Sequence, residues 1–192
     1  MPGLDDASDR WGVPAWLAPA ATREAAVLVL VYPGPDDEAF VLLMERPEGD
    51  LRHAGEVSFP GGVVEPEDAS PAAAALREAN EEMGLDVEQA GIDVLGELEP
   101  VVVRVSGFRL TPVLALGARR PYLEPDRHEV AAALEVPLEA FVSGAPIEVV
   151  EEERQGLRLR FGAYPVAGYR IWGATARILG QLAALVAERD PG

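Results

Sequence analysis

The sequence predicts an α/β protein in which a mixed β-sheet is flanked by helices. Short apolar runs of strand character are separated by turn-forming proline and glycine, and two segments have the periodicity and end signals of helices. With 192 residues, 48% of them hydrophobic, the chain can bury a core without disulfides. The sequence has no internal repeat or low-complexity linker. We therefore predict a single domain over residues 23–192, preceded by an N-terminal lead-in over residues 1–22.

The predicted strands are apolar runs rich in β-branched residues. In the lead-in, by contrast, proline, alanine and aspartate allow only a short helix at Pro14–Ala20. The predicted strands are Ala25–Tyr32, Ala39–Glu45, Val94–Val105, Arg109–Leu116, Ile147–Glu151, Leu157–Phe161 and Tyr169–Trp172. Between the second and third strands lie a charged loop, Arg46–Ala54, and the segment Phe59–Gly62, which a helix would not tolerate. Glu129–Leu134 is compatible with either a strand or a helix.

Two segments carry clear helix signals. Ser70 is a suitable N-cap for a helix over Pro71–Met83, and Gly84 is suited to end it. A second helix is expected over Gly173–Arg189, with Ile178, Leu182 and Leu185 on one apolar stripe. A short helix is expected near Glu139–Val142.

The charge and cysteine content exclude several classes of function. The chain has no cysteine, which excludes thiolate zinc sites and cysteine nucleophiles. The 16 basic residues are all arginine and face 33 acidic residues, so the net charge of −17 argues against a nucleic-acid or anionic-membrane partner. A small phosphorylated substrate stays open, because a divalent cation can reverse the sign locally. The chain shows neither signal peptide nor bilayer-spanning run, and we expect a soluble cytoplasmic protein.

The helix over Pro71–Met83 concentrates acidic side chains beside its apolar face. The apolar stripe comprises Ala72, Ala75, Leu76, Ala79 and Met83 and should face the sheet. Glu78, Glu81 and Glu82 occupy an adjacent arc, which we expect to be solvated. Such a cluster is either an ordinary acidic surface or a cation site, and oxygen ligands of this kind suit Mg²⁺ or Mn²⁺.

The string Arg77-Glu78-Ala79-Asn80-Glu81-Glu82-Met83-Gly84-Leu85, with Gly62 upstream, resembles the Nudix box. The upstream acid is Asp68 where the pattern has Glu, and eight rather than seven residues separate it from Arg77, so its role stays open. The resemblance implies a Nudix α/β/α sandwich and an enzyme that hydrolyses X-linked nucleoside diphosphates. It implies that Glu78 and Glu82 are metal ligands, that Glu81 is a third ligand or the base, and that Arg77 orients the glutamates through ion pairs.

Other segments resemble the coenzyme A diphosphatase subfamily of the Nudix hydrolases. They are Leu42-Leu43-Met44-Glu45-Arg46, Arg52-His53-Ala54-Gly55-Glu56-Val57-Ser58-Phe59-Pro60-Gly61-Gly62, Glu129-Val130, Val136-Pro137-Leu138 and Tyr169–Ala176. Met44 replaces a threonine, and an arginine of the motif is displaced by one position to Arg52. The residues that this resemblance implies for substrate binding are Arg46, Arg52, His53, Ser58, Phe59, Gly61 and Gly62. For Phe59 a place in the core is the better explanation than a stacking platform, whereas His53 is equally explicable as a surface residue.

The resemblance implies hydrolysis of coenzyme A and acyl-CoA to 3′,5′-ADP and 4′-phosphopantetheine or its acyl form, with Mg²⁺ or Mn²⁺ as cofactor. Two alternatives remain open at this point. One is a Nudix hydrolase of ADP-ribose or NADH. The other is a catalytically silent domain that senses a nucleotide. Whether the chain forms a homodimer is also left open.

Overall fold

The computed structural model describes residues 23–35, 38–47, 55–103, 106–142, 144–154 and 157–187. The expected lead-in, with its helix at Pro14–Ala20, lies outside these residues. No helix among the described residues combines the length and the apolar character that a membrane crossing needs.

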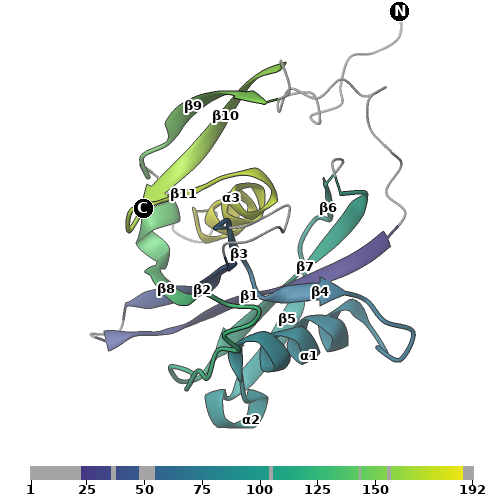
Figure 1. Cartoon of the computed structure of the whole chain (residues 1–192). Helices are drawn as coiled ribbons and strands as arrows, with labels where there is room; N and C mark the ends of the chain where they lie inside the picture. Colours follow the sequence, from purple (N-terminus) through teal and green to yellow (C-terminus); the bar gives the residue numbers. More distant parts are fainter. Residues whose placement is uncertain are drawn as a thin grey trace, which may run out of the picture.

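A mixed sheet forms the centre of the molecule (Figure 1). Its main path runs in the order β3-β2-β1-β7-β5, with β4, β6 and β8 paired to β1, β7 and β2. β1 and β7 run parallel, whereas the other pairs are antiparallel. The strands are β1 (Arg23–Pro33), β2 (Ala39–Glu45), β3 (Val57–Ser58), β4 (Gly61–Val63), β5 (Ile92–Glu97), β6 (Val101–Val103), β7 (Phe108–Gly117) and β8 (Ala132–Pro137).

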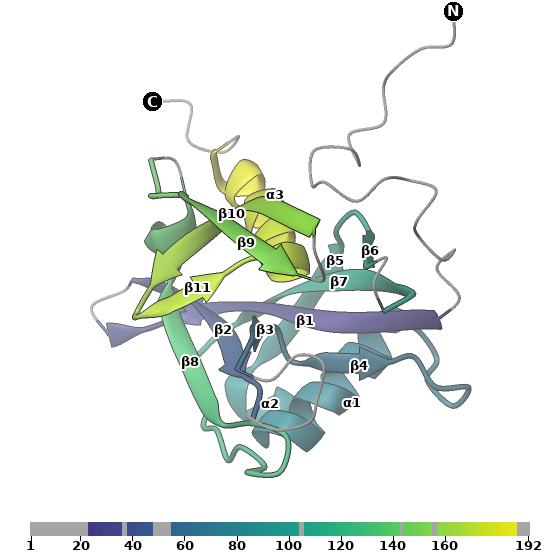
Figure 2. The same ribbon diagram turned by 45° about the horizontal axis from the view of Figure 1, so that its top comes forward.

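Helices cover both faces of this sheet, which confirms the predicted fold class. Figures 1 and 2 show α1 (Pro71–Met83) and α2 (Val87–Ala90) on one face and α3 (Gly173–Ala187) on the other. A second sheet lies on the α3 side and has the order β11-β10-β9. Its strands are β9 (Glu148–Arg154), β10 (Leu157–Val166) and β11 (Tyr169–Ile171), and a 3₁₀ turn, η4 (Leu138–Phe141), follows β8.

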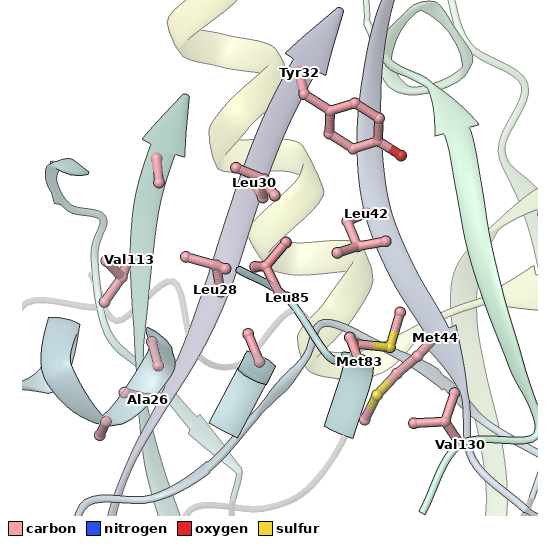
Figure 3. Packing of buried hydrophobic residues seen from close by; sticks show 14 residues of the cluster. Ala26, Leu28, Leu30, Tyr32, Leu42, Met44, Met83, Leu85, Val113 and Val130 are labelled. Carbon is pink, nitrogen blue, oxygen red and sulfur yellow. The ribbon is translucent and has the colours of Figure 1, made fainter. Parts of the chain in front are cut away.

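Each face of the sheet has its own buried core. On the α1 side, the helix stripe packs as predicted: Ala75, Ala79 and Met83 are fully buried, and Ala72 and Leu76 are partly buried against them. Figure 3 shows this core, in which Met83 lies beside Met44 of β2. A second core lies between the sheet and α3. The α1-side core fixes α1 against β1 and β4, and thereby places its acidic arc.

Helix α1 begins and ends where the sequence predicts. The Ser70 side chain accepts a hydrogen bond from the Ala73 amide at 3.1 Å, and Pro71 occupies the first turn. Gly84 adopts a left-handed conformation with φ 65° and donates its amide to the Asn80 carbonyl at 2.8 Å.

Several predicted boundaries were wrong. The strand predicted over Val94–Val105 is two strands, β5 and β6, because Pro100 lacks an amide donor and Leu98 instead bonds to Pro112 of β7. In the ambiguous segment Glu129–Leu134, the first three residues belong to the turn before β8 and the last three form the start of that strand. In α3 the buried stripe ends at Leu182, since the last turn is exposed and Leu185 is 42% accessible.

Candidate active site

Gly61 and Gly62, here called the glycine turn, are the first two residues of β4 and let α1 approach the sheet very closely. Gly61 and Gly62 pair with Val27 and Ala26 of β1. A Cβ atom at Gly61 would lie 2.3 Å from the Ala26 carbonyl oxygen, and its φ of +151° is one that side-chain-bearing residues rarely adopt. A Cβ atom at Gly62 would lie 2.4 Å from the carboxylate carbon of Glu78. The turn therefore needs both glycines to accommodate the backbone and the Glu78 carboxylate.

The expectation that Glu82 is solvated was wrong. Its exposed fraction is 4%, because α1 packs directly on the glycine turn. Its Oε2 accepts a hydrogen bond from the Gly61 amide at 2.8 Å, and its Oε1 lies 3.9 Å from Nη2 of Arg46. Burial, with smaller contributions from the charges of Glu78 and Glu129, raises the pKa of Glu82 to about 7 against the lowering effect of the Gly61 amide and Arg46.

Glu78 and Glu81 occupy two other environments on the same helix. The Glu78 side chain is 17% exposed, and burial raises its pKa although Arg77 opposes that effect. The Glu81 side chain is 57% exposed and lies 3.2 Å from Nη1 of Arg77. The two carboxylates turned toward the glycine turn are therefore those of Glu78 and Glu82, while Glu81 lies at the rim.

Arg77 ties the helix to the loop that precedes it. Its Nε and Nη2 donate to Asp68 at 3.1 and 3.0 Å, and Nη2 also donates to the Val63 carbonyl. Its Nη1 donates to Glu78 at 3.0 Å and to Glu81 at 3.2 Å. The hydrogen bonds from Arg77 hold the pKa of Asp68 below its ordinary value. The displaced acid Asp68 is thus the anchor of the arginine that contacts both glutamates.

The remaining predicted site residues divide into three groups. Arg46 reaches the carboxylates, as described above. Ser58 lies on β3 opposite Met44, and its buried hydroxyl has no hydrogen-bond partner among the described residues. Phe59 is 2% exposed in the α3-side core, so the structure favours the core explanation over a substrate contact. Arg52 and His53 lie outside the described residues.

Sequence reasoning did not assign a role to the loop over residues 118–131, which docks on the end of α1. The amides of Glu124 and Asp126 donate to the carbonyls of Met83 and Glu82, both at 2.9 Å. The loop brings Glu129 near enough for its charge to act on both Glu78 and Glu82. The one sequence signal for this loop was the resemblance of Glu129-Val130 to a segment of the coenzyme A diphosphatase subfamily. Nothing in the sequence indicated which residues would lie beside Glu129.

The donor set suits a hard divalent cation. Within the described part of the chain, no three His, Cys, Asp or Glu side chains are already gathered as metal ligands. Nevertheless, Glu78 and Glu82 offer only oxygen donors. Burial first, and neighbouring carboxylate charges second, raise the pKa of both groups, and a bound cation would offset both effects. The carboxylate chemistry therefore fits Mg²⁺ or Mn²⁺.

Comparisons with known proteins agree with the motif and the fold. A family model described as "NUDIX domain" matches residues 22–158. Proteins named "Uncharacterized Nudix hydrolase NudL" from Cronobacter sakazakii and Pectobacterium atrosepticum are both 39% identical, over 87% of this chain and 84% of their own length. Among solved structures, a Nudix hydrolase from M. Smegmatis, RenU, matches with TM-score 0.60 and 23% identity, over 87% of each chain.

Proposed function

Because this chain belongs to the Nudix hydrolase family, whose members act on phosphoric anhydride bonds, we propose that it hydrolyses the diphosphate of coenzyme A and acyl-CoA. The products are 3′,5′-ADP and 4′-phosphopantetheine or its acyl form. The family assignment supports the reaction class. The choice of substrate is supported by the motif segments around Arg46 and Gly61-Gly62, which resemble those of coenzyme A diphosphatases.

The observation that carries the proposal is the position of Arg46. The first motif segment ends in this arginine, and the fold brings it to 3.9 Å from a carboxylate of α1. The Arg46 side chain is 36% exposed, so its guanidinium can still reach a ligand. A planar, permanently charged group beside carboxylates is suited to binding a phosphate oxygen next to a metal ion. The protein thus supplies local positive charge despite its net charge of −17.

We assign Glu78 and Glu82 as the residues that hold the divalent cation. When bound, the cation would neutralise the diphosphate and acidify the attacking water. Arg77 orients Glu78, because a single guanidinium bonds Asp68, Val63 and Glu78 together. Gly62 leaves the room that the Glu78 carboxylate occupies.

A product-resolved substrate panel tests the proposal. Purified protein with Mg²⁺ or Mn²⁺ is offered CoA, acetyl-CoA, ADP-ribose and NADH, and products are separated by chromatography. We expect 3′,5′-ADP and 4′-phosphopantetheine from CoA at the highest kcat/KM. A preference for ADP-ribose or NADH would replace the substrate while keeping the reaction class, and turnover of none would favour a sensing role.

The same panel tests how the 3′-phosphate of CoA is recognised. On sequence grounds, Arg52 is the candidate, because it neighbours the displaced motif arginine. Arg52→Ala should raise KM for CoA much more than for 3′-dephospho-CoA. The difference between the binding free energies of the two substrates should narrow by about 1–3 kcal/mol. Equal losses on both substrates would show that Arg52 does not read this phosphate.

A further inference from the structure

The charged loop that begins at Arg46 connects two paired strands. β2 ends at Glu45, β3 begins at Val57, and these two residues are direct partners in the antiparallel pair. The pairing continues into the loop, because the Arg46 amide donates to the Glu56 carbonyl at 3.0 Å. The position of Arg46 therefore depends on how the Glu45–Val57 pair is held.

Side chains near the end of β2 alternate between the two faces of the sheet. Met44 is fully buried in the α1-side core. Glu45 points to the α3 side, where its Oε2 accepts a hydrogen bond from the Tyr169 hydroxyl of β11 at 2.9 Å. Arg46 returns to the α1 side, and its Nη2 lies 3.9 Å from Glu82. Glu45 is thus a residue through which the second sheet can act on Arg46.

A second hydroxyl holds the other member of the pair. Thr175, in the first turn of α3, is 8% exposed, and its hydroxyl donates to the Val57 carbonyl at 3.0 Å. Ile171, which lies between the two hydroxyl residues in the sequence, is buried in the same core as Val57. Tyr169 and Thr175 therefore hold both partners of one strand pair from the α3 side.

The Glu45–Val57 pair lies between the two groups that contact the Glu82 carboxylate. On one side along the chain is Arg46, near Oε1, and on the other is Gly61, whose amide donates to Oε2 at 2.8 Å. The two hydroxyls that hold the pair come from residues more than 100 positions away in the sequence. Because hydrogen bonds are directional, and stronger to a carboxylate, they fix the pair in position as well as stabilising it.

We infer that Tyr169 and Thr175 are positioning residues that hold Arg46 in place to bind the diphosphate, an inference that rests on the proposed function. Among the described residues, their hydroxyls bond to the β2–β3 pair and not to the carboxylates of α1. They therefore act through Glu45 and Val57. A guanidinium whose backbone is already fixed loses less conformational freedom when it meets a phosphate oxygen, and this preorganisation strengthens binding.

The test removes one hydroxyl at a time. Tyr169→Phe and Thr175→Val keep the shape of each side chain but not its hydrogen bond. In either variant, KM for the best substrate of the panel should rise roughly 3- to 10-fold with kcat unchanged, the size expected for one hydrogen bond that supports uniform binding. Thr175→Ser keeps the hydroxyl and should keep the wild-type KM. If both hydroxyls only stabilised the fold, Tyr169→Phe and Thr175→Val would lower Tm and leave KM unchanged, which would overturn the inference.

A double-mutant cycle shows whether Tyr169 acts through Arg46. Arg46→Ala alone should raise KM, and adding Tyr169→Phe to it should raise KM no further. Two effects that multiply would overturn the inference. The matched control is Tyr164→Phe on β10 of the same sheet, whose hydroxyl makes no hydrogen bond with the part of the chain that the structure describes. This control should keep the wild-type kcat and KM.

Binding of methylenediphosphonate, a diphosphate analogue that cannot be hydrolysed, separates this inference from the proposed function. In calorimetry with Mg²⁺ present, Tyr169→Phe should raise the Kd of the analogue by about the same factor as KM. If the wild type hydrolyses no substrate of the panel but Tyr169→Phe still weakens binding of the analogue, only the proposed function fails. If the two proteins bind the analogue equally, or neither binds it, the inference fails whatever the panel shows.

Discussion

Glu78, Glu81 and Glu82 lie on one arc of α1 but differ sharply in their surroundings. Glu82 is buried against the Gly61 amide, Glu78 lies over Gly62, and Glu81 is exposed beside Arg77. Helical periodicity places the three carboxylates together, and that much could be predicted from the sequence. Their burial could not, because it depends on how closely the glycine turn lets the helix approach β1 and β4.

The first residue-scale prediction concerns the two assigned metal ligands. Glu78→Gln and Glu82→Gln should each lower kcat by several orders of magnitude, because loss of a ligand removes several kcal/mol of charge stabilisation. Both variants should fold, since glutamine keeps an oxygen that can accept the Gly61 or Arg77 hydrogen bond. Steady-state kinetics at saturating Mg²⁺ with circular dichroism checks both points. Exposed Glu67→Gln serves as control, and wild-type turnover in either ligand variant would contradict the assignment.

The second residue-scale prediction concerns how the stability of the metal-free protein depends on pH. The folded-state pKa of Glu82, about 7, lies above its ordinary value of 4.5. Between these pH values the folded chain holds a proton that the unfolded chain releases. The free energy of unfolding should therefore fall as pH rises through this window, by at most about 3 kcal/mol. Below the window Glu82 contributes no pH dependence, and above it the destabilisation is complete and no longer changes with pH. Urea unfolding at pH 5 and pH 8 in EDTA measures this.

Glu82→Gln provides the comparison for that measurement. The variant has no titrating group at this position, so the part of the pH dependence due to Glu82 should disappear. The variant should also be more stable than the wild type at pH 8, because a buried charge has been removed. Parallel pH profiles for the two proteins would contradict the raised pKa.

At the scale of elements, the site is formed where a turn, a helix and a loop meet. The helix and its caps follow from local signals at Ser70, Pro71 and Gly84, which is why its ends could be predicted. The loop over residues 118–131 carries no comparable signal, since its position depends on backbone hydrogen bonds to the end of α1. The break between β5 and β6 was missed for a different reason. The predicted strand was continued through Pro100 because apolar residues lie on both sides of that proline.

The two glycines of the turn predict separable effects. A methyl group at Gly61 meets the rigid Ala26 carbonyl, so Gly61→Ala should destabilise the fold by roughly 2–4 kcal/mol. At Gly62 the methyl group meets the end of the Glu78 side chain, which can move. Gly62→Ala should therefore weaken Mn²⁺ binding and lower kcat, while the free energy of unfolding falls only slightly. Thermal unfolding and Mn²⁺ calorimetry on both variants separate the two effects.

Gly180 in α3 is the matched control for these substitutions. An added Cβ there would find only the Tyr164 hydroxyl, at 3.9 Å. Gly180→Ala should leave metal binding unchanged and stabilise the fold by about 0.5–1 kcal/mol, because alanine is preferred within a helix. If Gly62→Ala resembled Gly180→Ala in both measurements, the close approach of Glu78 to the glycine turn would not contribute to metal binding.

At the scale of the whole molecule, a net charge of −17 surrounds a site proposed to bind an anion. Local features oppose this field, among them the Arg46 guanidinium and the cation that Glu78 and Glu82 would hold. Repulsion of an anionic substrate at long range should slow its association, and mobile ions screen that repulsion beyond roughly 10 Å at 0.1 M salt. The composition, which argues against polyanionic partners, thus also predicts how salt affects the enzyme.

The prediction is that kcat/KM for CoA rises with added KCl at constant free Mg²⁺, because screening weakens the repulsion between substrate and protein. The increase should be steeper for CoA than for 3′-dephospho-CoA, which lacks one phosphate but shares the rest of the structure. Since both substrates meet the same site, the difference between their slopes isolates the long-range field from any effect of salt on the metal site. Initial rates measured well below KM across a KCl series give both slopes. A fall in kcat/KM with salt for both substrates would mean that attraction near the arginines outweighs the field of the whole chain.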